Sequence, residues 1–80
     1  MATLRLFAQA REAAGVGATS FEGSTVQDVL DAAVVRFGPG FAAVLAMSKV
    51  WVNGEEVPHS SAVSDKDEVA VLPPVSGGMQ

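Results

Sequence analysis

The chain has 80 residues, of which 49% are hydrophobic and 18% are charged, so it is long enough for one compact domain and too apolar for a disordered segment. The absence of cysteine excludes disulfide bridges, thiolate metal sites and a cysteine nucleophile. The net charge of −4 and the scattered cations argue against a nucleic-acid partner, because phosphate binding needs a basic stripe. A basic surface on another protein fits this charge better.

The start of the chain has no basic segment followed by a long apolar stretch, so no secretory signal is expected. No segment approaches the roughly 18 consecutive apolar residues of a membrane span. We therefore expect a cytoplasmic protein with no membrane partner.

The first quarter of the chain is predicted to form a hairpin. Residues 1–8 alternate, with Leu4 and Leu6 on one face, which is typical of a half-buried strand. Residues 9–17 are small and punctuated by glycine, so a turn is expected, with a short helical turn over residues 11–14. Residues 18–22 then return as a second strand.

The clearest helix follows. Its apolar residues recur at the spacing of a single helical face, namely Val26, Val29, Leu30, Ala33, Val34 and Phe37. Ser24 or Thr25 can cap its N-terminus, and Gly38-Pro39-Gly40 ends it. Residues 41–47 are expected to add a short helical turn, with Met47 packed in the core.

The second half of the chain is predicted to return to strands. Residues 50–53 and 55–58 flank Asn53-Gly54, a strong two-residue turn signal. Residues 59–66 read as a loop, and residues 68–72 alternate again. The order predicts a two-layer α+β fold of the β-grasp type, with a mixed sheet of four to five strands on one main helix and both terminal strands at its centre. Residues 1–75 would form the domain and residues 76–80 a tail.

The tail carries the most informative residues. Pro73-Pro74 ends the last strand because neither proline has an N–H to donate, and it stiffens the exit. The following Ser76-Gly77-Gly78 segment has no bulky side chains, so it can enter a narrow channel of another protein. A Gly-Gly pair alone is more typical of an ordinary turn, so its surroundings decide its meaning.

Those surroundings match one family along nearly the whole chain. The matching segments are Leu6-Phe7-Ala8-Gln9-Ala10-Arg11-Glu12, Thr25-Val26, Val52-Asn53-Gly54-Glu55, Asp65-Lys66-Asp67-Glu68-Val69-Ala70 and Pro73-Pro74-Val75-Ser76-Gly77-Gly78. With these segments the chain resembles the ubiquitin-like MoaD/ThiS sulfur-carrier family, and within it the molybdopterin synthase small subunits (MoaD).

The resemblance implies a carrier cycle at Gly77-Gly78. A ubiquitin-activating-like adenylyltransferase would use ATP to convert the terminal glycine into an acyl-adenylate, and sulfide from a persulfide donor would replace AMP to leave a thiocarboxylate. The large molybdopterin synthase subunit would then receive the sulfur in molybdenum cofactor biosynthesis. The chain would be the sulfur-donating subunit of a two-subunit sulfurtransferase, with no catalytic machinery and no tightly bound cofactor of its own.

One feature departs from the family. The second glycine is usually the last residue, whereas Met79 and Gln80 follow Gly78 here. Because an amide at Gly78 cannot be adenylated, we expect a processing protease to remove these two residues. The alternatives are an artificial extension and an inactive paralogue.

Partner binding is expected from exposed apolar residues near the tail. Alternation places Phe7 and Leu72 opposite the core-facing residues, and Trp51 can join them on the same face. The alternative is isolated surface hydrophobes. Arg11 matches a family position near the tail, which would allow it to pair with a carboxylate of the partner. An ordinary solvated arginine without such a role is an equally good interpretation. The full predicted partner-binding set is Phe7, Arg11, Trp51, Leu72, Pro73, Pro74, Val75 and Ser76.

No metal site or hydrolase site is expected. His59 is the sole histidine and lacks a second ligand, and Ser60-Ser61 lacks a nucleophile elbow. Two further functions stay open: a sulfur carrier for thiamine or cysteine biosynthesis, and a ubiquitin-like binding or tagging module without sulfur transfer.

Overall fold

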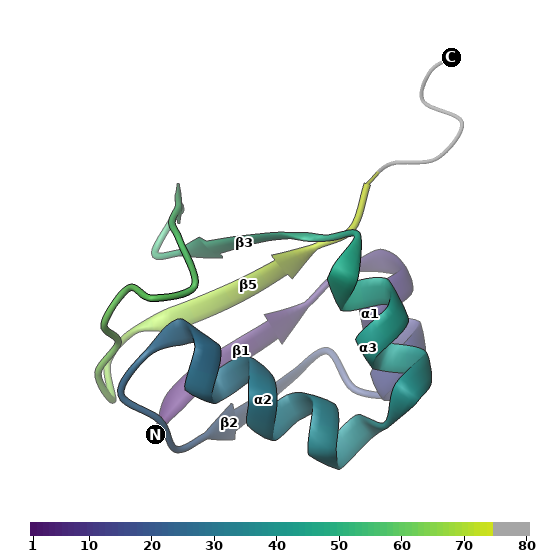
Figure 1. Cartoon of the computed structure of the whole chain (residues 1–80), viewed down its shortest axis with the longest axis horizontal. Helices are drawn as coiled ribbons and strands as arrows, with labels where there is room; N and C mark the ends of the chain where they lie inside the picture. Colours follow the sequence, from purple (N-terminus) through teal and green to yellow (C-terminus); the bar gives the residue numbers. More distant parts are fainter. Residues whose placement is uncertain (75–80) are drawn as a thin grey trace.

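The computed structural model describes residues 1–74 and consists of a sheet with helices along one side (Figure 1). The strands are β1 (Ala2–Leu6), β2 (Ala18–Phe21), β3 (Lys49–Val52), β4 (Glu55–Glu56) and β5 (Glu68–Leu72). The helices are α1 (Ala8–Ala14), α2 (Val26–Phe37) and α3 (Pro39–Ala46). The predicted α+β class and the order of the strands are confirmed.

The sheet is mixed and has the order β2-β1-β5-β3-β4. β1 and β5 lie side by side at its centre and run parallel, with Leu4 opposite Val69 and Leu6 opposite Val71. β2 pairs antiparallel with β1, and β3 pairs antiparallel with β5. The prediction that the two terminal strands are central is therefore correct, and this is the β-grasp arrangement.

Helix α2 begins and ends where the sequence predicts. Thr25 is its N-cap: its side chain accepts a hydrogen bond from the Asp28 N–H, and the Asp28 carboxylate accepts one from the Thr25 N–H. This reciprocal pair satisfies N–H groups that have no partner within the helix. Gly38 ends the helix with a φ of +91°, a backbone conformation that suits glycine.

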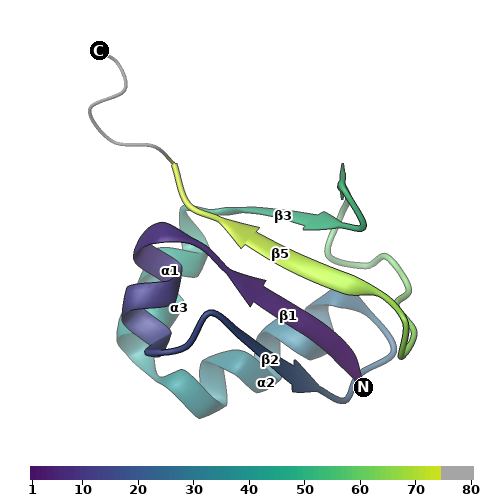
Figure 2. The same cartoon turned by 180° about the vertical axis from the view of Figure 1, so that it is seen from behind.

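Helices α1 and α3 are each longer than the single helical turn expected from the sequence. In α1 only Ala10 is buried, and in α3 only Phe41 is fully buried. α1 contains no large apolar residue and α3 is apolar on nearly all sides, so neither sequence shows the one-sided apolar pattern that predicts a full helix. The two helices contact each other beyond the end of the sheet at which β1 and β5 stop (Figures 1 and 2).

The core lies between the sheet and the helices. Its largest fully buried side chains are Phe41, Leu4, Leu30, Val26, Val29, Val69 and Val71. None of the helices within residues 1–74 covers the other face of the sheet, seen in Figure 2, and we call it the open face. No helix within residues 1–74 is both long enough and apolar enough to cross a membrane.

Candidate functional site

The site is built where the chain leaves β5. That strand ends at Leu72, after which Pro73 is buried and Pro74 is exposed. The exit lies at the end of the sheet next to α1 and α3 (Figure 1), which we call the tail end. We call the opposite end, where β5 begins, the far end. The predicted tail residues Val75, Ser76, Gly77 and Gly78, and the following Met79 and Gln80, lie outside the described residues.

Three side chains next to this exit belong to the open face. Lys49 pairs with Leu72 across β3 and β5, and Trp51 pairs with Ala70. The residues between them, Val50 and Val71, are buried against the helices. Since successive side chains of a strand point to opposite faces, Lys49, Trp51 and Leu72 share the open face.

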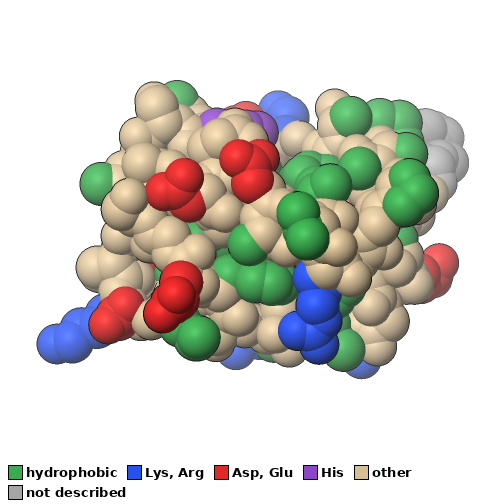
Figure 3. Space-filling view, turned by 60° about the horizontal axis from the view of Figure 1, so that its bottom comes forward, with side chains coloured by type: hydrophobic (Ala, Val, Ile, Leu, Met, Phe, Trp, Pro, Cys, Tyr) green, Lys and Arg blue, Asp and Glu red, His purple; other side chains and the backbone are tan. Residues whose placement is uncertain are grey.

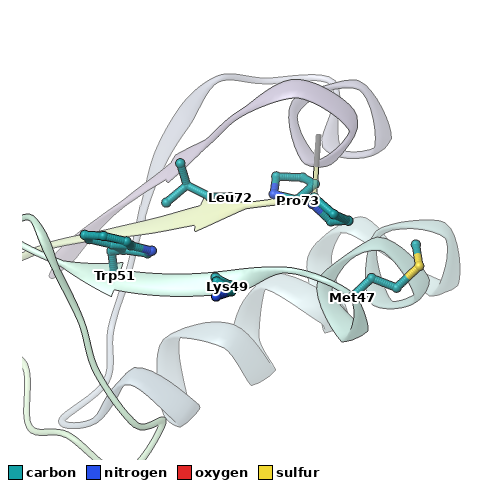
Figure 4. Close-up of a pocket in the computed structure, with 6 residues that line it drawn as sticks. Met47, Lys49, Trp51, Leu72 and Pro73 are labelled. Carbon is teal, nitrogen blue, oxygen red and sulfur yellow. The ribbon is translucent and has the colours of Figure 1, made fainter. Parts of the chain in front are cut away.

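A hollow of about 350 Å³ lies beside the exit, and we call it the tail-side hollow. In Figure 4 Trp51 and Leu72 project from the same side of the sheet, and Met47 extends from the end of α3. Apart from the lysine, the lining side chains are all apolar: Met47, Lys49, Trp51, Leu72, Pro73 and Pro74. An exposed apolar concavity of this kind is typical of an interaction site.

The structure brings together four of the predicted partner-binding residues, Trp51, Leu72, Pro73 and Pro74, and adds two that the sequence did not indicate. Met47 was expected in the core, and that prediction is wrong: Met47 is 60% exposed and caps the C-terminus of α3. It lies outside the core because α3 ends there, whereas Phe41 near the start of that helix is fully buried. The spacing of Lys49 and Trp51 in an alternating strand was the one available signal for Lys49.

Phe7 and Arg11 are not among the residues that line the hollow. Phe7 is 42% exposed and is the N-cap residue of α1. It directly follows Leu6, which pairs with Val71, so Phe7 and Leu72 come at the same level of neighbouring strands. Phe7 therefore lies at the border of the same surface.

Arg11 is exposed in the last turn of α1 and lies against Gly17. A Cβ atom on Gly17 would be 3.3 Å from Nε and 3.5 Å from Cζ of Arg11. The glycine thus leaves room for the guanidinium to lie on the backbone that leads into β2.

The charges on the open face are paired. Arg5 donates a hydrogen bond to Glu68, and the Lys49 Nζ lies 4.0 Å from a Glu56 oxygen. All four side chains are substantially exposed, so water screens both ion pairs and each contributes little to stability. Within residues 1–74 no group of three or more acidic, histidine or cysteine side chains could hold a metal ion.

The family follows from comparison with known proteins. A family model described as "ThiS family" matches residues 4–78. This chain belongs to the ThiS family. The match covers almost the whole chain, extends past the described residues through Gly77, and stops at Gly78.

Individual relatives of this ThiS-family chain agree with that assignment. It is 40% identical over 76 residues to the molybdopterin synthase sulfur carrier subunit of Arabidopsis thaliana, covering 91% of this chain and 78% of that one. It is 35% identical to the subunit of the same name from Haemophilus influenzae, with 98% and 100% covered. SAMP1 from Haloferax volcanii, a solved structure, superposes with a TM-score of 0.79 at 34% identity, with 95% and 97% covered.

Proposed function

We propose that this ThiS-family chain is the sulfur-carrying small subunit of a molybdopterin synthase, with sulfur held as a thiocarboxylate on Gly78. The observation that carries the proposal is the continuous family match over residues 4–78, which ends at the second glycine. Relatives named molybdopterin synthase sulfur carrier subunit cover nearly all of this chain.

The chemistry needs little from the carrier itself. The Gly78 carboxylate would attack the α-phosphate of ATP on a partner adenylyltransferase and release pyrophosphate. A sulfide equivalent would then attack the resulting acyl-adenylate, with AMP as the leaving group. Nucleophile activation and phosphate binding fall to the partner, so this chain has to present an accessible tail and a docking surface.

The tail-side hollow supports the presence of a docking surface beside the exit of β5. Trp51, Leu72 and Met47 offer apolar area, and Pro73-Pro74 restricts the backbone direction at the exit because proline fixes φ. We propose that the large synthase subunit covers the tail-side hollow while it takes up the tail. A stiff exit lowers the conformational entropy lost when the tail enters a channel.

Met79 has to be removed for this function. In an amide bond to Met79, Gly78 has no carboxylate to adenylate. We propose cleavage by a protease after Gly78, and the end of the family match at that residue supports it.

The test is a reconstituted transfer. The chain ending at Gly78 is loaded with sulfur, mixed with the large synthase subunit and a cyclic pterin phosphate, and the pterin is analysed for sulfur. The proposal expects sulfur on the pterin and a carboxylate restored on Gly78. A stable complex without transfer, or transfer by a variant lacking Gly77-Gly78, would contradict it.

A second candidate function is protein tagging, which the resemblance to SAMP1 from Haloferax volcanii favours, because other solved structures expand this name as small archaeal modifier protein 1. The two functions leave different products. Tagging would join Gly78 to lysines of other proteins, and because Lys66 is the last basic residue, trypsin would leave residues 67–78 on each target lysine. Detection of that remnant on many proteins would favour tagging.

A further inference from the structure

Met47 exposes a thioether at the tail end of the molecule. The residue is 60% exposed, and in Figure 4 its side chain extends from the end of α3. Met1, the other methionine within residues 1–74, lies at the far end, next to the start of β1. Within the described residues, the sulfur atom that solvent reaches beside the exit of β5 is therefore that of Met47.

Backbone hydrogen bonds, rather than its own side chain, fix the position of Met47. Its N–H donates to the Val44 carbonyl at 3.1 Å, and the Ser48 N–H donates to the Leu45 carbonyl at 3.0 Å. The Ser48 hydroxyl donates to the same Val44 oxygen at 2.7 Å. These bonds satisfy carbonyls at the C-terminus of α3 without any atom of the methionine side chain. A chemical change at the sulfur should therefore leave the fold intact.

The surroundings of this side chain are mostly apolar. The residues that line the tail-side hollow with it are Trp51, Leu72, Pro73, Pro74 and Lys49. The charged member, Lys49, has its Nζ 4.0 Å from a Glu56 oxygen. Helix α3 contains no charged residue, and in Figure 3 the hydrophobic side chains of the displayed face lie mainly in the right half, where α3 lies in Figure 1. A partner that covers the hollow would bury the thioether mainly against apolar groups.

We propose that Met47 is an oxidation site, and that its sulfoxide weakens docking of the partner. Hydrogen peroxide transfers one oxygen atom to the sulfur: the O–O bond breaks, an S–O bond forms, the sulfur loses two electrons and water leaves. The sulfoxide oxygen is a hydrogen-bond acceptor, and burying it without a donor costs free energy. Methionine sulfoxide reductases reverse the change, so the modification would be a reversible control of docking.

The free carrier is the form that would be oxidised. This inference rests on the proposed function, in which the chain visits an adenylyltransferase and then the large synthase subunit. The hollow is uncovered between the two visits, so peroxide can reach Met47 at that stage. When the large subunit covers the hollow, the same sulfur should be oxidised more slowly.

The experiment compares three chains that end at Gly78: the natural sequence, Met47→Leu, and Met47→Leu combined with Val35→Met. Val35 is 86% exposed on α2, so the third chain carries its methionine away from the hollow. Each chain is treated with hydrogen peroxide, catalase removes the excess, and fragmentation mass spectrometry locates the added oxygen. Isothermal titration calorimetry then measures binding to untreated large synthase subunit, and circular dichroism melting checks the fold.

We expect oxidation of Met47 to weaken binding by about tenfold, with little change in melting temperature, and a methionine sulfoxide reductase to restore binding. The two chains with leucine at this position should bind equally well before and after treatment. Unchanged binding by the oxidised natural chain, equal losses in all three chains, or a Met47 that peroxide does not oxidise would overturn the inference. Absence of binding by the untreated natural chain would instead refute the proposed function, and the inference with it.

Discussion

Lys49 and Leu72 lie directly opposite each other on β3 and β5, so a charge and an apolar side chain meet at the border of the tail-side hollow. A lysine in this position can lay its aliphatic stem on apolar surface while its ammonium stays in water. The pair therefore places an apolar contact and a positive charge side by side, next to the exit of the tail.

The first prediction concerns Leu72, which is 36% exposed. Leu72→Asp should weaken binding of the large synthase subunit by about tenfold or more, because a carboxylate would be desolvated in an apolar contact. The melting temperature should change little, since the side chain is not in the core. Isothermal titration calorimetry and thermal melting measure the two quantities.

Val35→Asp is the matched control for this variant. Val35 is 86% exposed on α2, on the side of the molecule away from the open face. It should leave binding unchanged. Equal loss of binding in both variants, or a large drop in the melting temperature of Leu72→Asp, would contradict the assignment of Leu72 to a docking surface.

Gly17→Ala tests whether the position of Arg11 matters. The added methyl group would be 3.3 Å from Arg11 Nε, which is tighter than ordinary contact, so the guanidinium should shift. If Arg11 contacts the partner, Gly17→Ala should weaken binding in the natural chain and have no further effect in an Arg11→Ala background. A double-mutant cycle with binding as the readout measures this coupling. Equal effects in both backgrounds would show that Gly17 acts independently of Arg11.

Asp67 links the β3–β4 turn to the start of β5. The Asn53 side-chain amide donates to one of its oxygens at 2.9 Å and the Ser64 N–H donates to the other at 2.8 Å. These bonds, that from Asn53 first, lower the pKa of Asp67 below its ordinary value. The group therefore stabilises the fold above the unfolded-state pKa of about 3.9, and this contribution is lost as the pH falls through the lower folded-state pKa.

Asp67→Asn should accordingly destabilise the protein at neutral pH and cost progressively less as the pH falls below that range. Urea unfolding at a series of pH values measures the difference in unfolding free energy. Glu12→Gln makes the same charge change at the tail end and serves as the control. A cost for Asp67→Asn that does not vary with pH would contradict the link.

Gly23 lies against the first turn of α2. A Cβ atom there would be 2.7 Å from Asp28 Cβ and 3.2 Å from the backbone nitrogen of Val29, so Gly23→Ala forces the helix and the preceding segment apart. We expect a loss of about 1–3 kcal/mol in the unfolding free energy, as for other overpacked sites. Chemical denaturation measures it. Gly40→Ala is the control because nothing lies within 4 Å of its added methyl group, and a similar loss in both would argue against this packing account.

Much of the fold was predictable because its signals are local. The apolar period of α2, the cap at Thr25 and the Asn53-Gly54 turn each identify an element from neighbouring residues. The alternation of β5 correctly placed Val69 and Val71 inside and Leu72 outside.

The site was only partly predictable, because its composition depends on which elements meet. Leu72 and Trp51 were expected on the open face, but nothing local indicates that α3 ends beside them. The C-terminus of α3 puts Met47 at the hollow rather than in the core.

Intact mass measurement of the chain ending at Gly78 shows whether that residue can carry sulfur. The chain is incubated with ATP, the adenylyltransferase and a sulfide source, next to the same chain extended by Met79-Gln80 and a variant lacking Gly78. We expect a mass gain equal to the exchange of one oxygen for sulfur, located by fragmentation on Gly78, in the first chain alone. No gain in that chain, or an equal gain in the extended chain, would contradict it.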